Sequence, residues 1–349
     1  MFEFKKIKPT RSKATLLEVL SQEAQVFSSM LDIPVDFEGR FALDNNKRFE
    51  MALFRGAHIS QNGGGKLYIF PTCLGNKLFT YPHFTRVSWF NYLDGYCLAV
   101  DDPFRDPSVD PEGGRGATYF FGSKDVDCLS LLAPMILELA KKLSVSPNNI
   151  VIVGSSNGGF AAIRLASLIG NDCLAIALNP ILSIVDREKI GSGVGFAHRF
   201  KISLDDICFC KRLSVLDDLL NSKNFKFVVF SNPRSSFDIR VTKSLFDLIG
   251  VKRQYGEGEY LKIREGGYFI NTPFYRGDNY PEPVHSIFLQ TESILLVSWF
   301  MLQVNRERST TFCINEADFM LMLRSHIGRL QSIVKLKEQI FLDTSKEHN

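Results

Sequence analysis

A serine flanked by glycines at fixed spacing is the residue of this chain best suited to covalent chemistry. Gly154, Ser156 and Gly158 form the pattern G-x-S-x-G, with the apolar run 151–153 before them and a helical pattern after them. On a strand-to-helix turn of this kind the serine hydroxyl is presented for attack, and the glycines let the strand and the helix approach closely. The sequence therefore predicts Ser156 as the nucleophile of acyl chemistry.

The backbone around Ser156 also predicts a place for the negative charge that develops on the attacked oxygen. The N–H of Asn157 lies at the positive end of the following helix, where it can hold an oxyanion. A second donor is expected in the loop after the strand at 67–71, from the backbone of Thr72 or Cys73. The alternative interpretation of the same helix start is a phosphate-binding site.

A serine hydroxyl needs a base, and chain order limits which histidine can provide it. Where the nucleophile sits on such a turn, the order is Ser, then Asp or Glu, then His, which leaves His285, His326 and His348. His326 falls in an amphipathic segment and His348 in the terminal tail, whereas His285 lies in a Pro- and Gly-containing loop before a long apolar run. We expect His285 to be the base, with an ordinary loop histidine as the alternative. His83 could reach the same site, but an aromatic-rich turn favours a structural role.

The acid that orients this base is expected in a loop after a parallel strand, because such loops gather at the carboxyl edge of the sheet. Asp238 follows the apolar run 225–230 and is the first candidate. It also directly precedes a helical pattern, so capping of that helix is the alternative role. Asp278, Asp217 and Asp218 are the other acids to consider.

The segments around these residues alternate between short apolar strands and amphipathic helices. This alternation predicts an α/β fold with a mostly parallel sheet and helices on both faces. Strands are expected at 96–100, 150–153, 173–178 and 225–230, and helices at 125–143, 158–169, 215–220 and 241–249.

The amino-terminal part shows a different pattern. Residues 14–31 place apolar side chains at helical spacing, and the runs 48–58 and 66–72 are separated by a glycine-rich turn that is typical of an antiparallel hairpin. We expect a helical extension at 1–45 before a catalytic domain at 46–309.

The carboxyl-terminal part is expected to be helical. Residues 259–271 alternate like a last strand or a hairpin, and 286–304 form a long apolar helix. An amphipathic helix at 316–341 lies within a final segment, 310–349, and could pack on the body or form a homodimer.

Composition excludes several classes of function. The formal net charge is only +3, from 41 basic and 38 acidic residues among 349, so nucleic acid is not an expected partner. The basic start lacks the apolar region of a secretory signal, and the longest apolar run, 294–304, is too short to span a membrane. We expect a cytoplasmic protein.

The cysteines and a glycine cluster indicate no metal or dinucleotide site. Seven cysteines, an odd number, are scattered among apolar neighbours, as in a reduced protein. Cys208 and Cys210 have no second pair at zinc spacing, so no metal is expected. The run 191–196 is rich in glycine but follows no strand, which argues against dinucleotide binding.

The stretch VGSSNGGFAAIRLA, with VDDPFRDP and YFFG before it and IALNP after it, resembles a known family. It is similar to α/β-hydrolase-like proteins of bacterial surface-polysaccharide loci, which include capsule O-acetyltransferases. The resemblance covers roughly residues 65–300 and is specific around Ser156.

The resemblance implies acyl chemistry on sugar hydroxyls. Acetyl-CoA would be the donor and a co-substrate rather than a permanently bound cofactor. Ser156 would be acetylated, His285 would act as base and then as acid, and Asp238 would orient it. Two alternatives remain open: a carbohydrate esterase or other serine hydrolase with the same triad, and a non-catalytic scaffold that keeps the fold.

Overall fold

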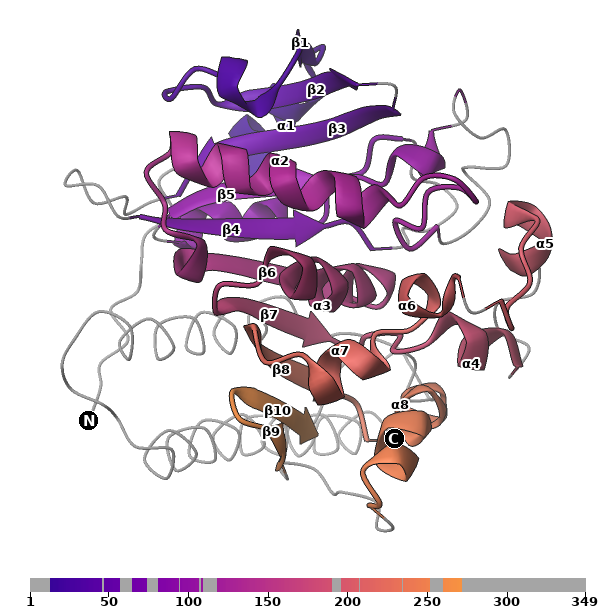
Figure 1. Cartoon of the computed structure of the whole chain (residues 1–349). Helices are drawn as coiled ribbons and strands as arrows, with labels where there is room; N and C mark the ends of the chain where they lie inside the picture. Colours follow the sequence, from indigo (N-terminus) through magenta and orange to yellow (C-terminus); the bar gives the residue numbers. More distant parts are fainter. Residues whose placement is uncertain are drawn as a thin grey trace, which may run out of the picture.

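The described residues form a ten-stranded sheet in the computed structural model (Figure 1). Its strand order is β1-β2-β3-β5-β4-β6-β7-β8-β10-β9. The strands are β1 Gln25–Phe27, β2 Gly39–Asn45, β3 Lys47–Arg55, β4 Lys66–Pro71, β5 Gly95–Val100, β6 Ile150–Ser155, β7 Cys173–Leu178, β8 Phe225–Ser231, β9 Tyr260–Arg264 and β10 Gly267–Asn271. The residues that the structure describes are 13–45, 47–56, 65–73, 81–93, 95–106, 108, 118–189, 196–206, 208–233, 235–251 and 260–271.

The sheet is mostly parallel: β1 pairs parallel with β2 at one edge, and only β3 and β9 run against the other strands. Strands β5, β4, β6, β7, β8 and β10 run in one direction, so their carboxyl ends meet at one edge. At one margin β3 pairs antiparallel with both β5 and β2, and at the other β9 pairs antiparallel with β10. Loops from the parallel strands can therefore build a site together at that edge.

The helices of the described chain cover both faces of the sheet. Helices α2 and α3 lie on one face and α1 on the other (Figure 1). The α-helices are α1 Lys13–Ser21, α2 Cys128–Lys142, α3 Asn157–Ile169, α4 Ile184–Lys189, α5 Phe196–Phe200, α6 Cys210–Leu213, α7 Leu216–Asn221 and α8 Ser236–Leu248. Short 3-10 helices are η1 Met30–Asp32, η2 Val87–Tyr92, η3 Pro103–Arg105 and η5 Pro147–Asn149.

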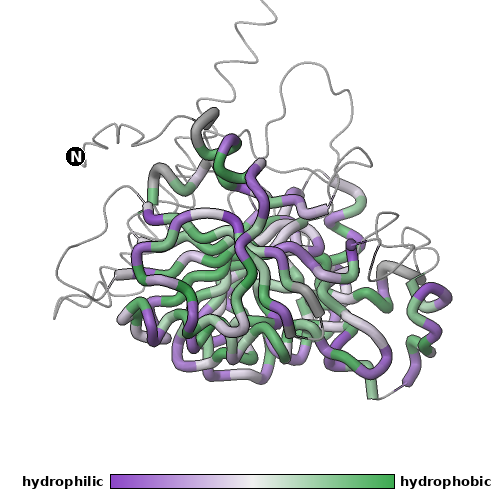
Figure 2. The backbone as a smooth tube through the Cα atoms, turned by 90° about the horizontal axis from the view of Figure 1, so that it is seen from above, coloured by the Kyte–Doolittle hydropathy of each residue, from purple (hydrophilic) through white to green (hydrophobic). Residues whose placement is uncertain are grey.

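Burial on both faces explains why the central strands are apolar at every position. In β6, Ile150 and Ile152 join the core under α2 and α3, whereas Val151 and Val153 join the core on the opposite face. Successive side chains of a strand point to opposite faces, so a strand covered on both sides has no polar face. Figure 2 accordingly shows hydrophobic residues gathered in the middle of the described part of the molecule.

The predicted α/β class with a mostly parallel sheet is confirmed, but the predicted hairpin of 48–58 with 66–72 is wrong. Strand β3 pairs with β2 and β5, while β4 lies between β5 and β6 and is parallel to both. The two segments are both apolar strands, and local patterning could not show that β5 inserts between them. Choice of partner depends on pairing between segments that are distant in sequence.

The amino-terminal segment also differs from the expected long helix. Helix α1 ends at Ser21, and β1 and β2 then add two strands to the sheet, so the sheet begins within 1–45. Phe27, Phe37 and Phe41 form a cluster with ring centroids 5.5 to 6.1 Å apart. This packing gives Phe27 a place in an extended strand rather than on a helix.

Only some of the elements predicted for the carboxyl-terminal part fall on residues that the structure describes. Residues 260–271 form a hairpin, β9 and β10, which is one of the two forms expected for this stretch. The expected helices at 286–304 and 316–341, and with them the surface predicted for a homodimer, lie outside the described residues.

Candidate active site at the carboxyl edge of the sheet

Ser156 occupies a strained turn between β6 and α3. Its backbone dihedrals are φ 53° and ψ −120°, a conformation that residues with a side chain rarely adopt. The turn is held by its own backbone: the Ser156 N–H donates to the Leu178 oxygen over 3.0 Å, and the Ser156 oxygen accepts from Ile181 N over 3.2 Å. The side chain is only partly buried. A turn of this kind is where the nucleophile predicted from the sequence would be exposed at the sheet edge.

The glycines on either side of Ser156 are required by close contacts between backbones. A Cβ on Gly154 would stand 1.9 Å from the oxygen of Gly158, and a Cβ on Gly158 would stand 2.7 Å from the oxygen of Pro71. Real Cβ atoms essentially never approach so closely. The G-x-S-x-G spacing therefore has a steric reason in this structure, and Gly158 places the helix start directly against the end of β4.

The helix start does not use the Ser156 hydroxyl. Ser156 stands at the N-cap position of α3, yet its side chain makes no capping hydrogen bond. A serine in this position usually accepts from the helix backbone. Asn157, the first residue of α3, is buried beside it, and the first N–H groups of a helix have no acceptor within that helix. This arrangement suits both a nucleophile and an oxyanion donor.

The loop after β4 reaches the same place. The Thr72 N–H already donates to the Val100 oxygen over 2.9 Å, and the Thr72 hydroxyl donates to the His83 oxygen over 2.8 Å. Of the two expected donors, Thr72 is therefore committed to the end of the sheet. The N–H of Cys73, the next residue in the loop, is left as the candidate for the second oxyanion donor.

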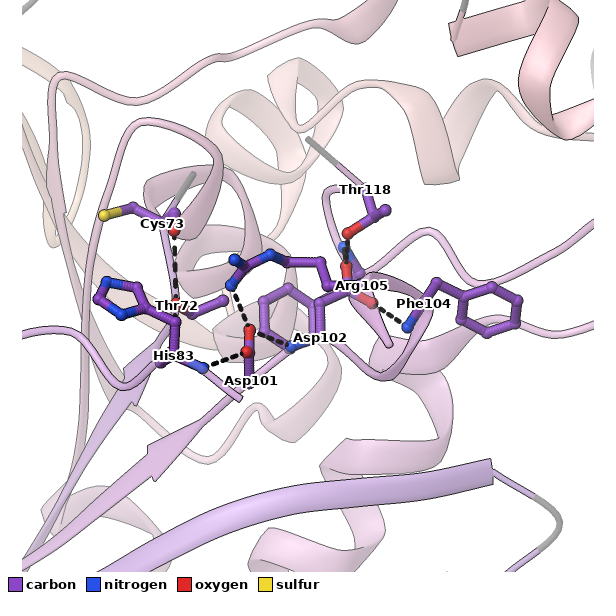
Figure 3. A network of polar contacts seen from close by, with 9 residues as sticks. Thr72, Cys73, His83, Asp101, Asp102, Phe104, Arg105 and Thr118 are labelled. Atoms are coloured by element: carbon purple, nitrogen blue, oxygen red, sulfur yellow. Dashed lines mark hydrogen bonds and ion pairs between the residues drawn. The ribbon is translucent and has the colours of Figure 1, made fainter. Parts of the chain in front are cut away.

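Sequence analysis missed a buried polar network at the end of β5 (Figure 3). The Asp101 carboxylate accepts from the backbone N–H of His83 over 2.6 Å and of Asp102 over 2.8 Å. It also accepts from Arg105 Nη1 over 2.7 Å. These bonds tie the segment at His83, and through it Thr72, to the neighbouring strand. The signal in the sequence was the pair of aspartates directly after an apolar strand.

Asp102 fixes a second loop to the same strand end. It accepts from Phe104 N over 3.0 Å, and from the Thr118 hydroxyl and the Phe120 N–H (Figure 3). The Asp102 side chain is buried, and burial raises its pKa. The segment that begins at Thr118 is thereby held against the loop after β5.

The pKa values of Asp101, Asp102 and His83 are shifted chiefly because these side chains are removed from water. Burial raises the pKa of Asp101 to about 7, against the opposing effects of Arg105 and of its hydrogen bonds. Burial lowers the pKa of His83, and the positive charge of Arg105 adds to this effect. The cluster is thus a buried support under the loops of the site, and its two aspartates hold a proton more readily than exposed aspartates do.

Asp238 lies in the first turn of α8 rather than in the loop before it. Ser235 caps this helix by accepting from the Asp238 N–H over 3.2 Å, so the expected alternative, capping by Asp238, does not describe the structure. The carboxylate is 1% exposed and accepts from Asn179 Nδ2 over 2.8 Å. Asn179 directly follows β7, next to Leu178, which binds the Ser156 backbone. Asp238 and Ser156 are therefore anchored to adjacent residues at one strand end.

The protein has the α/β-hydrolase fold. A capsule O-acetyltransferase of Neisseria meningitidis serogroup A matches with a TM-score of 0.52 and 14% identity, over 76% of this chain and 94% of that one. A histidine-to-alanine variant of that enzyme in complex with CoA matches with a TM-score of 0.51 and 13% identity, over 83% of this chain and 99% of that one. The resemblance expected from the sequence is confirmed at the level of the fold.

A third solved structure, esterase 2 of Thermogutta terrifontis phosphoramylated by tabun, has a TM-score of 0.48 and 18% identity, over 76% of this chain and 94% of that one.

Comparison of the amino-acid sequence with known proteins finds no relative. No protein-family profile matches the chain, and no curated protein sequence is significantly similar to it.

Two of the other acids considered from the sequence lie away from the candidate site at Ser156. Asp218 accepts from Ser167 over 2.5 Å and from Arg164 over 3.3 Å, near the end of α3 that is remote from Ser156. Asp217 accepts from Asn221 within α7. Asp278 lies outside the described residues.

The base predicted for the candidate site also lies outside the described residues. The structure does not describe His285, so the triad stays a prediction. His83 is placed beside Thr72 and bonds Asp101 through its backbone, which is a structural use of this residue. Within the described segments, no helix combines the length and the apolar character needed to cross a membrane.

Proposed function

We propose that this protein is an acyltransferase that works through an acyl-Ser156 intermediate. The observation that carries the proposal is the backbone of Ser156, held at φ 53° between β6 and α3 with a hydroxyl that does not cap the helix. Non-glycine residues persist in such strained conformations where the surrounding structure requires them, and they cluster at active sites. Asp238 and His285 complete the proposed triad.

The first half of the reaction transfers the acyl group to the enzyme. The imidazole of His285 takes the proton of Ser156 while Oγ attacks the carbonyl carbon of a thioester. The N–H groups of Asn157 and Cys73 stabilise the oxyanion that forms. The C–S bond then breaks, the thiolate takes the proton from the imidazolium, and free thiol leaves an ester on Ser156.

The second half transfers the acyl group to an acceptor hydroxyl. His285 takes the proton of that hydroxyl as its oxygen attacks the ester, and returns it to Ser156 when the C–O bond to the serine breaks. Asp238 keeps the imidazole oriented and stabilises its cationic form in both halves. Each turnover consumes one thioester and one alcohol, and yields one thiol and one ester.

The substrates proposed are acetyl-CoA and a hydroxyl of a surface polysaccharide or its precursor. Support for this choice comes from the fold shared with the meningococcal capsule O-acetyltransferase, a variant of which binds CoA. With acetyl-CoA as donor the reaction belongs in the cytoplasm. Water as acceptor would make the same machinery an esterase.

The test is release of CoA from acetyl-CoA with and without added capsular glycans. We expect release that depends on a glycan, with the acetyl group recovered on the sugar, and no release by Ser156→Ala. Release that is equal without any acceptor would establish hydrolysis instead. Unchanged activity of Ser156→Ala would overturn every function that uses this serine.

A fluorophosphonate probe separates an enzyme from a scaffold that keeps only the fold. Such probes label serines that are activated by a base. We expect labelling of the full chain at Ser156, and none in Ser156→Ala. A folded protein whose Ser156 stays unlabelled would support the scaffold.

A further inference from the structure

The side chain of Asn179 occupies a position that stability alone does not explain. Asn179 follows β7 with a positive φ of 46°, a conformation that asparagine tolerates better than most residues with a side chain. Its N–H donates to the Phe230 oxygen over 2.7 Å, which joins the ends of β7 and β8. The residue is 1% exposed.

Only one of the two polar atoms of the Asn179 side-chain amide makes a hydrogen bond with the described residues. Nδ2 donates to Asp238 Oδ2 over 2.8 Å, whereas Oδ1 is buried and accepts no hydrogen bond from the described residues. A buried carbonyl oxygen without a partner reduces the stability of the folded state. The same amide donates a hydrogen bond to the buried carboxylate of Asp238, and such a bond is stronger than one between neutral groups.

The Asp238 carboxylate is directed to this amide rather than to its own helix. An acid in the third position of a helix can accept from the N-cap N–H, as in a capping box. Here the Ser235 N–H donates instead to the Asn232 oxygen over 3.2 Å. The contact with Asn179 therefore joins α8 to the strand end that also holds the Ser156 backbone through Leu178.

We propose that Asn179 is a positioning residue of the acyl-transfer site, acting through Asp238. Its amide holds the carboxylate at the orientation in which Asp238 can fix the imidazole of the base. This inference rests on the proposed function. It adds to the triad a fourth residue, whose contribution to the rate exists only while the Asp238 carboxylate is present.

The test compares rates of fluorophosphonate labelling at Ser156 in a double-mutant cycle. Asn179→Gly removes the amide and keeps a residue that accepts a positive φ without strain. We expect its labelling rate to fall about 10- to 100-fold, the value of a hydrogen bond to a charged group. In an Asp238→Ala background the same change should alter the rate by less than about twofold. Asn179→Ser is the second variant, should the glycine variant not fold.

A matched control separates positioning from stability. The Thr242 hydroxyl is buried and donates to the main-chain oxygen of Asp238 over 2.8 Å, not to its carboxylate. Thr242→Val should lower the melting temperature while leaving the labelling rate within about twofold of the unmodified protein. The melting temperature of each Asn179 variant is measured beside it.

The outcomes distinguish this inference from the proposed function. Labelling of Asn179→Gly at the normal rate, or losses that multiply in the double variant, would overturn the role of Asn179 while Ser156 still reacts. Failure of both Asn179 variants to fold would assign the residue to stability and also overturn it. Absence of labelling at Ser156 in the unmodified chain would overturn the proposed function itself.

Discussion

The backbone N–H of Ser156 donates to the carbonyl oxygen of Leu178 across 3.0 Å. Leu178 is the last residue of β7 and pairs with Ser155 at the end of β6. The strained turn is thus fastened to the neighbouring strand, in the middle of a parallel sheet that is buried on both faces. A rigid ladder of this kind can hold a backbone conformation that an isolated turn would leave.

Replacing Ser156 by glycine should make the protein more stable than replacing it by alanine. Both variants lose the hydroxyl, but only glycine adopts a φ of 53° without a Cβ penalty. We expect a difference of about 1 kcal/mol in the free energy of unfolding, measured by urea denaturation. Equal stabilities would show that the turn relaxes and stores no strain.

Gly158→Ala should be destabilised and should lose labelling at Ser156. The new Cβ would stand 2.7 Å from the oxygen of Pro71 and 2.8 Å from that of Thr72, so helix and strand must separate. We expect a cost of about 1 to 3 kcal/mol in the free energy of unfolding. Gly65→Ala is the control, because its Cβ would meet nothing within 4 Å. Similar effects of both substitutions would contradict the steric explanation.

Asp101 should make stability fall as pH rises. Its pKa in the folded protein is about 7, raised chiefly by burial, against 3.8 for an ordinary aspartate. Between these values the folded state keeps a proton that the unfolded state has released, so the free energy of unfolding decreases as pH increases through this window. Asp101→Asn does not titrate, and its stability should fall less steeply between about pH 5 and about pH 7. Parallel curves in urea denaturation would contradict the assignment.

His285→Ala should label at Ser156 far more slowly than the unmodified protein. Without a base the hydroxyl is a weak nucleophile, and we expect a loss on the order of a thousand-fold in the labelling rate. His198→Ala, a change at an exposed position on α5, should leave the rate unchanged. A normal rate in His285→Ala would remove this residue from the triad and direct the search to other histidines.

Arg212→Lys should weaken the packing of the loop that precedes α2. The guanidinium donates to the carbonyl oxygens of Phe121 over 2.6 Å and Val126 over 2.8 Å, and its carbon stands 4.0 Å from the Phe121 ring centroid. An ammonium group cannot make these bonds and stack at the same time. We expect a loss of about 2 kcal/mol in the free energy of unfolding. Lys211→Arg, at the exposed neighbouring position, should have no effect.

Much of the site was predictable because its central part is local. The apolar run of β6, the two glycines and the helical pattern of α3 are contiguous in the chain, and each follows from sterics or periodicity. Residues 173–178 form β7 as expected, and β8 extends the predicted 225–230 by one residue. These strands are buried on both faces of the sheet, so nearly every residue in them is apolar and the sequence shows them clearly.

The parts that were not predictable depend on contacts between distant segments. The start of α8 is decided by Ser235, which caps it before Asp238, and the Asp238 carboxylate accepts a hydrogen bond from Asn179, which follows β7. The polar network of Asp101 joins residues from three segments, and the aspartate pair after β5 does not show in the sequence which residues it will bind.

The sequence by itself determined the central strands and the helices that follow them, and which serine stands on the turn between β6 and α3, because periodicity and backbone sterics act over a few residues. The tertiary structure alone decided that β5 separates β3 from β4, that β1 and β2 extend the sheet, and that Asn179 faces Asp238. Those outcomes depend on which surfaces bury one another, and a linear pattern of polar and apolar residues does not specify that choice.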